Sequence, residues 1–208
     1  MIIAIDGPTA SGKGTIARAL AAHFGLPHLD TGLLYRAVGR QVFLAGGNPD
    51  DPEQALAATA FPDSLLEDPE LRSEETGGLA SRVSIHPAVR AALLERQQAF
   101  ANQPGGAVLD GRDIATVIAP HAPAKLFVTA SVAARALRRW AEMQGQGRTV
   151  SREAIEADLA ARDERDANRA QAPLRQAPDA ALLDTSAMGR EVAIAAAIAL
   201  VEKQLAKS

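Results

Sequence analysis

The chain has 208 residues, of which 47% are hydrophobic, so it can bury the core of one domain and is not a disordered protein. Its 22 Lys and Arg against 25 Asp and Glu give a net charge of −3, which argues against a globally basic nucleic-acid-binding protein. The absence of cysteine excludes a disulfide scaffold and a thiolate site. The longest apolar run, Val192–Val201, is too short to span a membrane, and the N-terminus does not resemble a signal peptide. We therefore expect a cytoplasmic protein with neither membrane nor nucleic-acid partner.

Short apolar runs alternate with segments of helical composition along the chain. Strands are predicted over Met1–Ile5, Leu26–Leu29, Ala107–Leu109, Lys125–Thr129 and Ala181–Leu183. Helices are predicted over Lys13–His23 and Leu33–Ala45, from Pro52, from Pro87, around Ala133–Trp140, from Ser151 towards Asn168, and at the C-terminal end. This alternation predicts an α/β fold with a five-stranded parallel sheet covered by flanking helices.

Three segments carry more specific expectations. The spacing of Ala133, Leu137 and Trp140 predicts an apolar stripe and places Trp140 in the core. The last helix should bury a stripe formed by Ile194, Ile198, Val201 and Leu205. Residues 47–81 are short, acidic and without strand alternation, so we expect a reduced, helical subdomain there.

The strongest motif is the glycine-rich stretch between the first strand and the first helix. It consists of Gly7, Pro8, Thr9, Ala10, Ser11, Gly12, Lys13, Gly14 and Thr15, and it fits the pattern G-x-x-x-x-G-K. Backbone N–H groups of such a loop surround an anion, the helix N-terminus adds a favourable dipole, and Lys13 can reach the β- and γ-phosphates. Gly14 stands where the full motif has Ser or Thr, so we assign no direct protein ligand for Mg²⁺.

Three further polar segments follow predicted strands or lie on a predicted helix. They are Asp30–Arg36 (DTGLLYR), Asp110–Asp113 (DGRD) and Arg162–Arg169 (RDERDANR). The first two lie at strand ends, where open α/β sheets bind ligands, although a capped helix and an internal salt bridge are the alternatives. In the third, Arg162, Asp166 and Arg169 should share one helix face, the alternative being a solvated charged face.

Together, GPTASGKGT, DTGLLYR, LDGRD and RDERDANR resemble the bacterial cytidylate kinases, and the similarity runs almost end to end. The resemblance implies a nucleoside-monophosphate kinase fold with a small monophosphate-binding subdomain and a lid. It also implies transfer of the γ-phosphoryl group of ATP to CMP or dCMP, giving CDP or dCDP and ADP. Mg²⁺ would arrive bound to ATP.

The resemblance also assigns residues. The nine residues of the glycine-rich loop would bind ATP. Around the cytosine it implies Thr31, Ser81, Arg90 and Asp113; on the CMP phosphate Arg36, Arg112 and Arg169; and on the sugar Arg162 and Asp166. Lys13, Arg112, Arg165 and Arg169 would stabilise charge in the transition state. A carboxylate at Asp113 suits the cytosine amino group and Arg90 suits N3 or O2, whereas uracil reverses that pattern.

The resemblance further suggests a division of the chain. The core would comprise residues 1–46, 84–144 and 170–208, the monophosphate-binding subdomain residues 47–83, and the lid residues 145–169, with a hinge over Gln144–Arg148. We expect a monomer. His23, His28, His86 and His121 lack metal-ligand spacing and are expected to be structural or exposed.

Three alternatives are weighed against this hypothesis. The first is a kinase of the same fold that acts on UMP, dTMP, AMP or an alcohol. The second is a nucleotide-dependent switch; a guanine-reading N-K-x-D motif is absent from the sequence. The third is an inactive homologue, which the presence of Lys13, Arg36, Arg112, Asp113 and Arg169 argues against.

Overall fold

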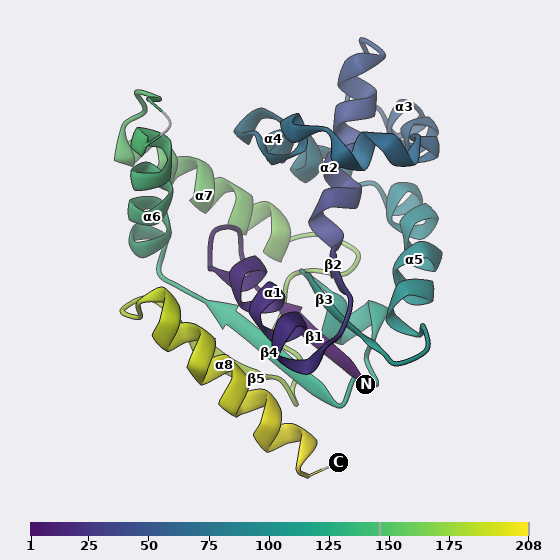
Figure 1. Ribbon diagram of the computed structural model, residues 1–208. Helices are drawn as coiled ribbons and strands as arrows, with labels where there is room; N and C mark the ends of the chain where they lie inside the picture. Colours follow the sequence, from purple (N-terminus) through teal and green to yellow (C-terminus); the bar gives the residue numbers. More distant parts are fainter. Residues whose placement is uncertain (146, 208) are drawn as a thin grey trace. The chain divides into compact units, whose positions relative to one another are not determined.

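The computed structural model describes residues 1–145 and 147–207, so Gln146 in the expected hinge lies outside the described residues. The chain divides into two compact units (Figure 1). The larger contains Met1–Leu29 and Ala101–Ser208, and the smaller contains Asp30–Phe100. Each unit has its own hydrophobic core and is described by itself.

The sheet has five strands in the order β2-β3-β1-β4-β5. They are β1 (Ile2–Asp6), β2 (His28–Asp30), β3 (Ala107–Gly111), β4 (Ala124–Thr129) and β5 (Ala181–Asp184). β1 pairs in parallel with both β3 and β4, and β4 pairs in parallel with β5. β1 and β3 are buried along their whole length, as expected for strands covered on both faces. The predicted α/β sheet is confirmed, and its parallel strands end at one common edge.

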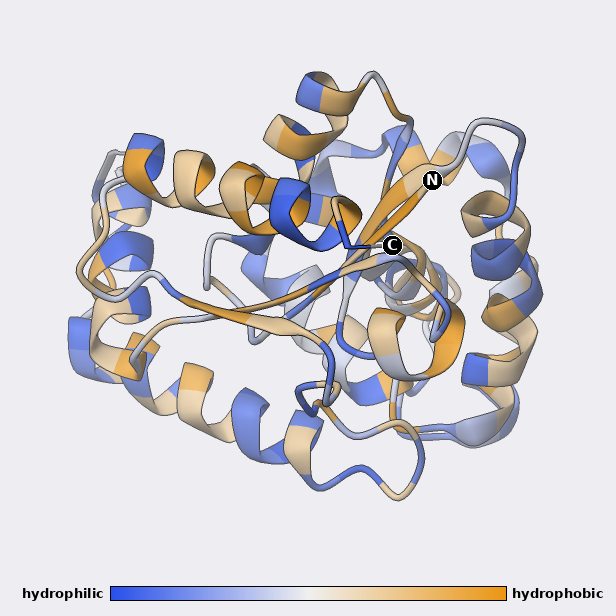
Figure 2. Cartoon of the chain, turned by 90° about the horizontal axis from the view of Figure 1, so that it is seen from below, coloured by the Kyte–Doolittle hydropathy of each residue, from blue (hydrophilic) through white to orange (hydrophobic). Residues whose placement is uncertain are grey.

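Besides a short π-helix over Ile114–Ile118, the described residues of the larger unit form four α-helices. They are α1 (Lys13–Phe24), α6 (Val132–Gly145), α7 (Arg152–Ala167) and α8 (Arg190–Leu205). Ile5 and Leu126 of the strands, Leu20 of α1 and Val201 of α8 belong to one buried cluster. In Figure 2 the strands near the N-terminus are mainly hydrophobic, whereas the helices alternate between hydrophobic and hydrophilic residues. α1 and α8 therefore bury one face each against the sheet, while α6 and α7 share an apolar cluster of their own.

The stripe predicted for the last helix is confirmed in part. Val201 is fully buried, while Ile194, Ile198 and Leu205 are partly buried and pack against the same core. The fully enclosed positions of α8 include the small residues Ala193 and Ala197. Together with Val201 they belong to the buried cluster that α8 shares with α1 and the strands. Within residues 1–145 and 147–207, no helix is both long and apolar enough to cross a membrane.

The prediction for α6 is wrong. Leu137 and Trp140 are 48% and 37% exposed, whereas Arg135 is only 2% exposed. Arg135 is buried because its guanidinium group donates hydrogen bonds to backbone carbonyls and to a carboxylate, which compensates for the loss of water. An apolar periodicity argument assigns arginine to the outside and cannot anticipate this reversal.

The smaller unit is helical. It contains α2 (Thr31–Leu44), α3 (Pro52–Ala57), α4 (Glu74–Val83) and α5 (Pro87–Ala101), with three short 3₁₀ helices between α3 and α4. Leu34, Val38, Leu71 and Leu93 lie in its core. No strand is present between residues 47 and 83, all of which the structure describes, so the expected helical character of this segment is confirmed.

Candidate functional site

The glycine-rich loop connects β1 to α1, as the motif predicts. Gly12 adopts a left-handed conformation (φ 90°) and begins α1 without a side-chain cap. Gly7 cannot be replaced without a clash, because a Cβ there would lie 2.0 Å from the carbonyl oxygen of Val128. Ser11 is completely buried and its hydroxyl has no hydrogen-bond partner among the described residues. Backbone anion-binding loops share these features.

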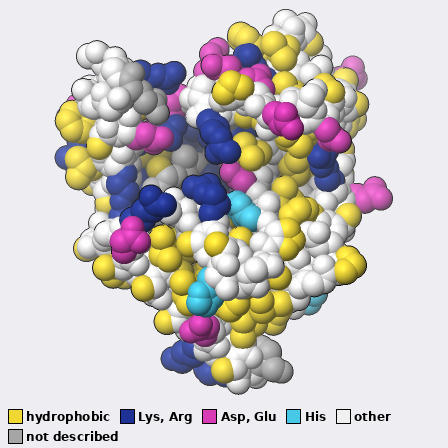
Figure 3. Space-filling view, in the orientation of Figure 1, with side chains coloured by type: hydrophobic (Ala, Val, Ile, Leu, Met, Phe, Trp, Pro, Cys, Tyr) yellow, Lys and Arg dark blue, Asp and Glu magenta, His cyan; other side chains and the backbone are white. Residues whose placement is uncertain are grey.

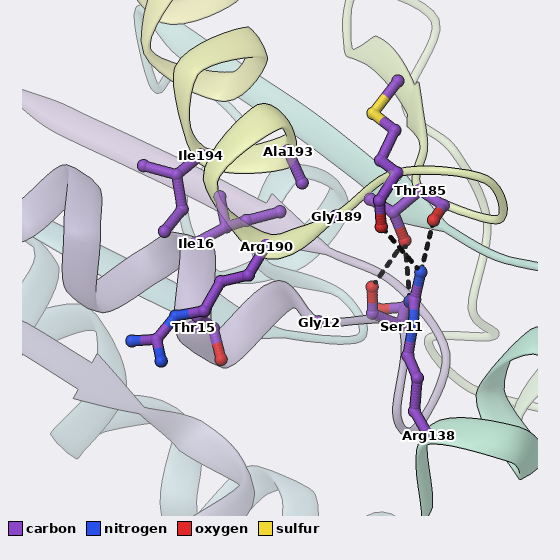
Figure 4. Close-up of a pocket in the computed structure, with 11 residues that line it drawn as sticks. Ser11, Gly12, Thr15, Ile16, Arg138, Thr185, Gly189, Arg190, Ala193 and Ile194 are labelled. Carbon is purple, nitrogen blue, oxygen red and sulfur yellow. Dashed lines mark hydrogen bonds between the residues drawn. The ribbon is translucent and has the colours of Figure 1, made fainter.

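A cavity of about 370 Å³ lies beside this loop (Figure 4). Its walls come from the loop and α1, from α6, and from α8 with the segment that joins it to β5. Ile16, Ala193 and Ile194 form apolar surfaces of the cavity. Arg138 of α6 donates hydrogen bonds to the Thr185 hydroxyl (3.1 Å) and to backbone carbonyls of the same segment. The cavity therefore has apolar walls and a fixed polar rim.

Thr185 links this rim to the loop. Its hydroxyl donates to the carbonyl oxygen of Ser11 at 3.0 Å, across 174 residues of sequence. Arg138, Thr185 and the residues that follow were missed by the sequence analysis. The signal that could have found them is positional, because Thr185 comes directly after β5, at the same edge of the sheet as the other polar segments.

Two arginines of the larger unit converge on one carboxylate near the loop. Arg112 donates through Nε to Oδ2 of Asp166 (2.7 Å), and Arg169 donates to the other oxygen of Asp166. Arg112 also donates to the hydroxyl of Thr9 in the loop. Burial alone would raise the pKa of Asp166, but the charges and hydrogen bonds of both arginines outweigh it and hold that pKa below its usual value. Three residues that the sequence assigned to one ligand are thus brought together.

The remaining candidates on α7 behave differently from one another. Arg162 is 6% exposed and its Nε lies 2.8 Å from Oδ2 of Asp158. Arg165 is exposed and forms no hydrogen bond or ion pair with any residue that the structure describes. The expectation that Arg169 continues the helix face is wrong, because α7 ends at Ala167. The backbone N–H of Asn168 closes the helix on Glu164, and Arg169 reaches Asp166 from the segment beyond it.

The turn after β3 is held by a buried carboxylate. Asp6, the last residue of β1, accepts hydrogen bonds from the backbone N–H groups of Ile114 and Ala115, both at 2.8 Å. Burial raises the pKa of Asp6 to about 7, although the two N–H groups act in the opposite direction. Asp113 raises it further through its negative charge. Asp6 thereby fixes the backbone that carries Arg112 and Asp113, and Asp113 itself is 4% exposed.

Another carboxylate lies next to the loop. A Cβ on Gly14 would be 3.8 Å from Oδ2 of Asp110, at the end of β3. Oδ1 of the same carboxylate is 2.7 Å from Nε2 of His28.

Lys and Arg side chains gather in the part of the larger unit where Figure 1 draws the beginnings of α1 and α6 (Figure 3). No cluster of three or more His, Cys, Asp or Glu residues suited to a metal occurs in the described ranges.

The smaller unit carries the other four candidates. Arg36 donates through Nη1 to the carbonyl oxygens of Leu71 (2.8 Å) and Ser73 (3.0 Å), so its side chain is held along the segment before α4. The guanidinium of Arg90 lies 5.6 Å from the centre of the Tyr35 ring. Thr31 is 3% exposed. The buried hydroxyl of Ser81 has no hydrogen-bond partner in the described part of the chain.

Comparison with known proteins gives a family. A family model described as cytidylate kinase matches residues 3–203. A cytidylate kinase of Xanthobacter autotrophicus is 58% identical over 206 residues, covering 99% of both chains, and one of Caulobacter sp. is 55% identical, covering 99% of this chain and 96% of the relative. The chain belongs to the cytidylate kinase family.

Membership in the cytidylate kinase family establishes the reaction class. The chain is a phosphotransferase that acts on CMP or dCMP and gives CDP or dCDP. This answers the alternatives of a different acceptor and of a nucleotide switch. Among solved structures, an uncharacterized protein from Eubacterium ventriosum aligns with a TM-score of 0.56 at 14% identity, covering 97% of this chain and 98% of that one. At that identity, the likeness supports the α/β fold alone.

Proposed function

We propose that the glycine-rich loop and the adjoining cavity bind ATP, and that Arg112, Asp166 and Arg169 belong to the CMP site. The observation that carries this proposal is the convergence of two arginines on Asp166 beside Thr9 of the loop. A phosphate accepts the same forked hydrogen bonds as a carboxylate, with more charge. The two guanidinium groups are therefore suited to hold the monophosphate close to the phosphate-binding loop.

The nucleoside of ATP fits the cavity lined by Ile16, Ala193 and Ile194. Apolar walls suit the faces of a purine ring, while the polar rim around Arg138 and Thr185 fixes its edges. The phosphates would extend from this cavity along residues 7–15 towards Lys13. All of these residues belong to the larger unit.

For the acceptor, we propose that Arg36 holds the CMP phosphate together with Arg112 and Arg169. Thr31, Ser81, Arg90 and Asp113 would contact the cytosine, and Arg162 and Asp166 the sugar. Support comes from each unit separately: the buried hydroxyl of Ser81 has no hydrogen-bond partner among the described residues, and Asp113 is buried. Residues 47–83 would form the monophosphate-binding part and residues 145–169 the lid.

Charge neutralisation is the main catalytic demand, because negative charge spreads over the transferred phosphoryl group. We propose that Lys13, Arg112 and Arg169 meet it, with Arg165 joining from the exposed side of α7. Mg²⁺ bound to ATP would supply further positive charge. The oxygen donors present fit such an ion, since the carboxylate of Asp110 lies beside Gly14 and the Thr15 side chain lines the nucleotide cavity.

We also propose that the protein is a monomer and works in the cytoplasm. Light scattering would test the first proposal and cell fractionation the second.

The decisive experiment measures ADP formation with ATP and Mg²⁺ against CMP, dCMP, UMP, AMP and dTMP at equal concentrations. We expect CMP and dCMP to be preferred, and Asp113→Ala to reduce the preference over UMP by at least tenfold, because the acceptor for the cytosine amino group is lost. Glu156→Gln on α7 serves as the control, because its carboxylate pairs with exposed Arg152 and is not assigned to either substrate. An unchanged CMP-to-UMP ratio in Asp113→Ala would remove Asp113 from the base site.

A further inference from the structure

Arg135 connects three separate parts of the larger unit. Its Nη1 donates to the carbonyl oxygen of Thr9 in the glycine-rich loop (3.1 Å), and its Nε donates to the carbonyl oxygen of Ala130 (2.9 Å). The same guanidinium forms a two-pronged pair with Asp163 of α7, with an Nη1–Oδ1 distance of 3.0 Å. Arg135 is 2% exposed, so these bonds replace all of its water. One buried side chain thus joins the loop to α7.

A second bridge runs parallel to the first. Arg112 donates to the hydroxyl of Thr9 and to Asp166 of α7. Asp163 and Asp166 are three residues apart and therefore lie on the same side of α7. Thr9 accepts from one arginine through its carbonyl and from the other through its hydroxyl, so both bridges begin at a single loop residue.

Apolar packing joins the same two regions. Ala10, the residue after Thr9, packs against a cluster formed by Ala136 and Met143 of α6 and Ile155 and Leu159 of α7. The loop tip is therefore held to the α6–α7 pair by charge on one side and by side-chain packing on the other. A movement of Thr9 and Ala10 requires α7 to move with them or these contacts to break.

We propose that Arg135 and Asp163 are positioning residues that couple nucleotide binding at the glycine-rich loop to the position of α7. Neither residue is assigned to a substrate; they act through Thr9 and through the helix that carries Arg162 and Asp166. When the loop orders around phosphate, Thr9 fixes Arg135, and Arg135 fixes α7. The second nucleotide then binds to an α7 that is already ordered, so its binding does not carry the entropic cost of ordering that helix. The binding of the two substrates is therefore cooperative. This inference rests on the proposed assignment of the loop to ATP and of α7 to CMP.

The chemistry requires arginine at position 135. A planar fork can bond two carboxylate oxygens and two carbonyl groups at once, whereas a lysine ammonium has three donors and no fixed plane. Arg135→Lys keeps the charge but cannot maintain all the contacts to Thr9, Ala130 and Asp163. We expect it to weaken the coupling even though the ion pair can persist.

The test measures the Kd of CMP by calorimetry, with and without a saturating non-hydrolysable ATP analogue and Mg²⁺. The coupling is the Kd of CMP without the analogue divided by its Kd with the analogue. We expect this ratio to be above one for the wild type. For Asp163→Asn we expect the ratio to fall by about 2- to 30-fold. Asp163→Glu, which retains the carboxylate, should recover part of the loss. Glu156→Gln is the matched control, because Glu156 is also an arginine-paired carboxylate of α7, but its partner Arg152 lies on the same helix.

Each outcome has a defined meaning. A folded Asp163→Asn variant with the wild-type ratio overturns the proposal, and so does a wild-type ratio of one. In either case CMP and the ATP analogue still bind, so the proposed function stands. Failure of the wild type to bind them would instead refute the proposed sites. If Asp163→Asn does not fold, Arg135→Lys decides, because it keeps the charge but loses part of the contacts to Thr9, Ala130 and Asp163, and it should lower the ratio as well.

Discussion

Replacing Asp6 with asparagine should change how the stability of the protein depends on pH. Asp6 lies at the end of β1, is 1% exposed, and accepts two backbone hydrogen bonds from the turn after β3. Burial raises its pKa from 3.8 to about 7, more than the two N–H groups lower it. Below pH 3.8 the carboxyl is protonated in both states, and above pH 7 it is ionised in both.

Between these values the folded protein binds one proton more than the unfolded chain. The free energy of unfolding therefore falls as pH rises from about 4 to about 7, by about 1.4 kcal/mol per pH unit, or about 4 kcal/mol in total from this residue. Asparagine is neutral throughout, so Asp6→Asn lacks this contribution. Relative to the wild type, the variant should become more stable by up to about 4 kcal/mol across the same pH interval.

The assay is urea-induced unfolding of both proteins at pH 4.5, 5.5, 6.5 and 7.5, with the free energies compared at each pH. Other titrating groups affect both proteins equally and cancel in the difference. A difference that stays constant within about 0.5 kcal/mol over the four pH values would refute the reasoning, because it would mean that Asp6 ionises alike in folded and unfolded chains.

Three further predictions concern the larger unit. Gly7→Ala should abolish nucleotide binding, measured by calorimetry, because the new Cβ would lie 2.0 Å from the Val128 carbonyl oxygen and displace the loop. An unchanged affinity would contradict the close approach of Gly7 to Val128. Leu20→Ala removes a fully buried side chain and should lower the free energy of unfolding by about 2–5 kcal/mol, measured by urea titration; a loss under 1 kcal/mol would contradict its place in the core. Asp166→Asn leaves two arginines without their shared carboxylate and should cost about 3 kcal/mol while raising the KM for CMP, both of which would be absent if the cluster were not a unit.

The sequence by itself determined the sheet, the loop and the family. Apolar runs of strand length are stable only when both faces of the strand are buried, which indicates a covered parallel sheet. Gly7 and Gly12 indicate a backbone that turns around an anion. The order of four motifs predicted a cytidylate kinase, and that prediction is confirmed. The assignments of individual residues to ATP, cytosine, sugar and phosphate remain predictions, as do the division into core, subdomain and lid and the monomeric state.

Only the tertiary structure decided which charges are buried and what they contact. Periodicity placed Trp140 in the core, whereas the structure exposes Trp140 and buries Arg135 instead. Arg135 can be buried because it is compensated by Thr9 and Asp163, which are distant in sequence. The helix predicted from Ser151 towards Asn168 is confirmed as α7, but only the structure shows that Arg169 lies beyond its end and reaches Asp166 from there. Local patterns report hydrophobicity and turn chemistry, whereas the burial of a charge depends on partners that folding brings from elsewhere in the chain.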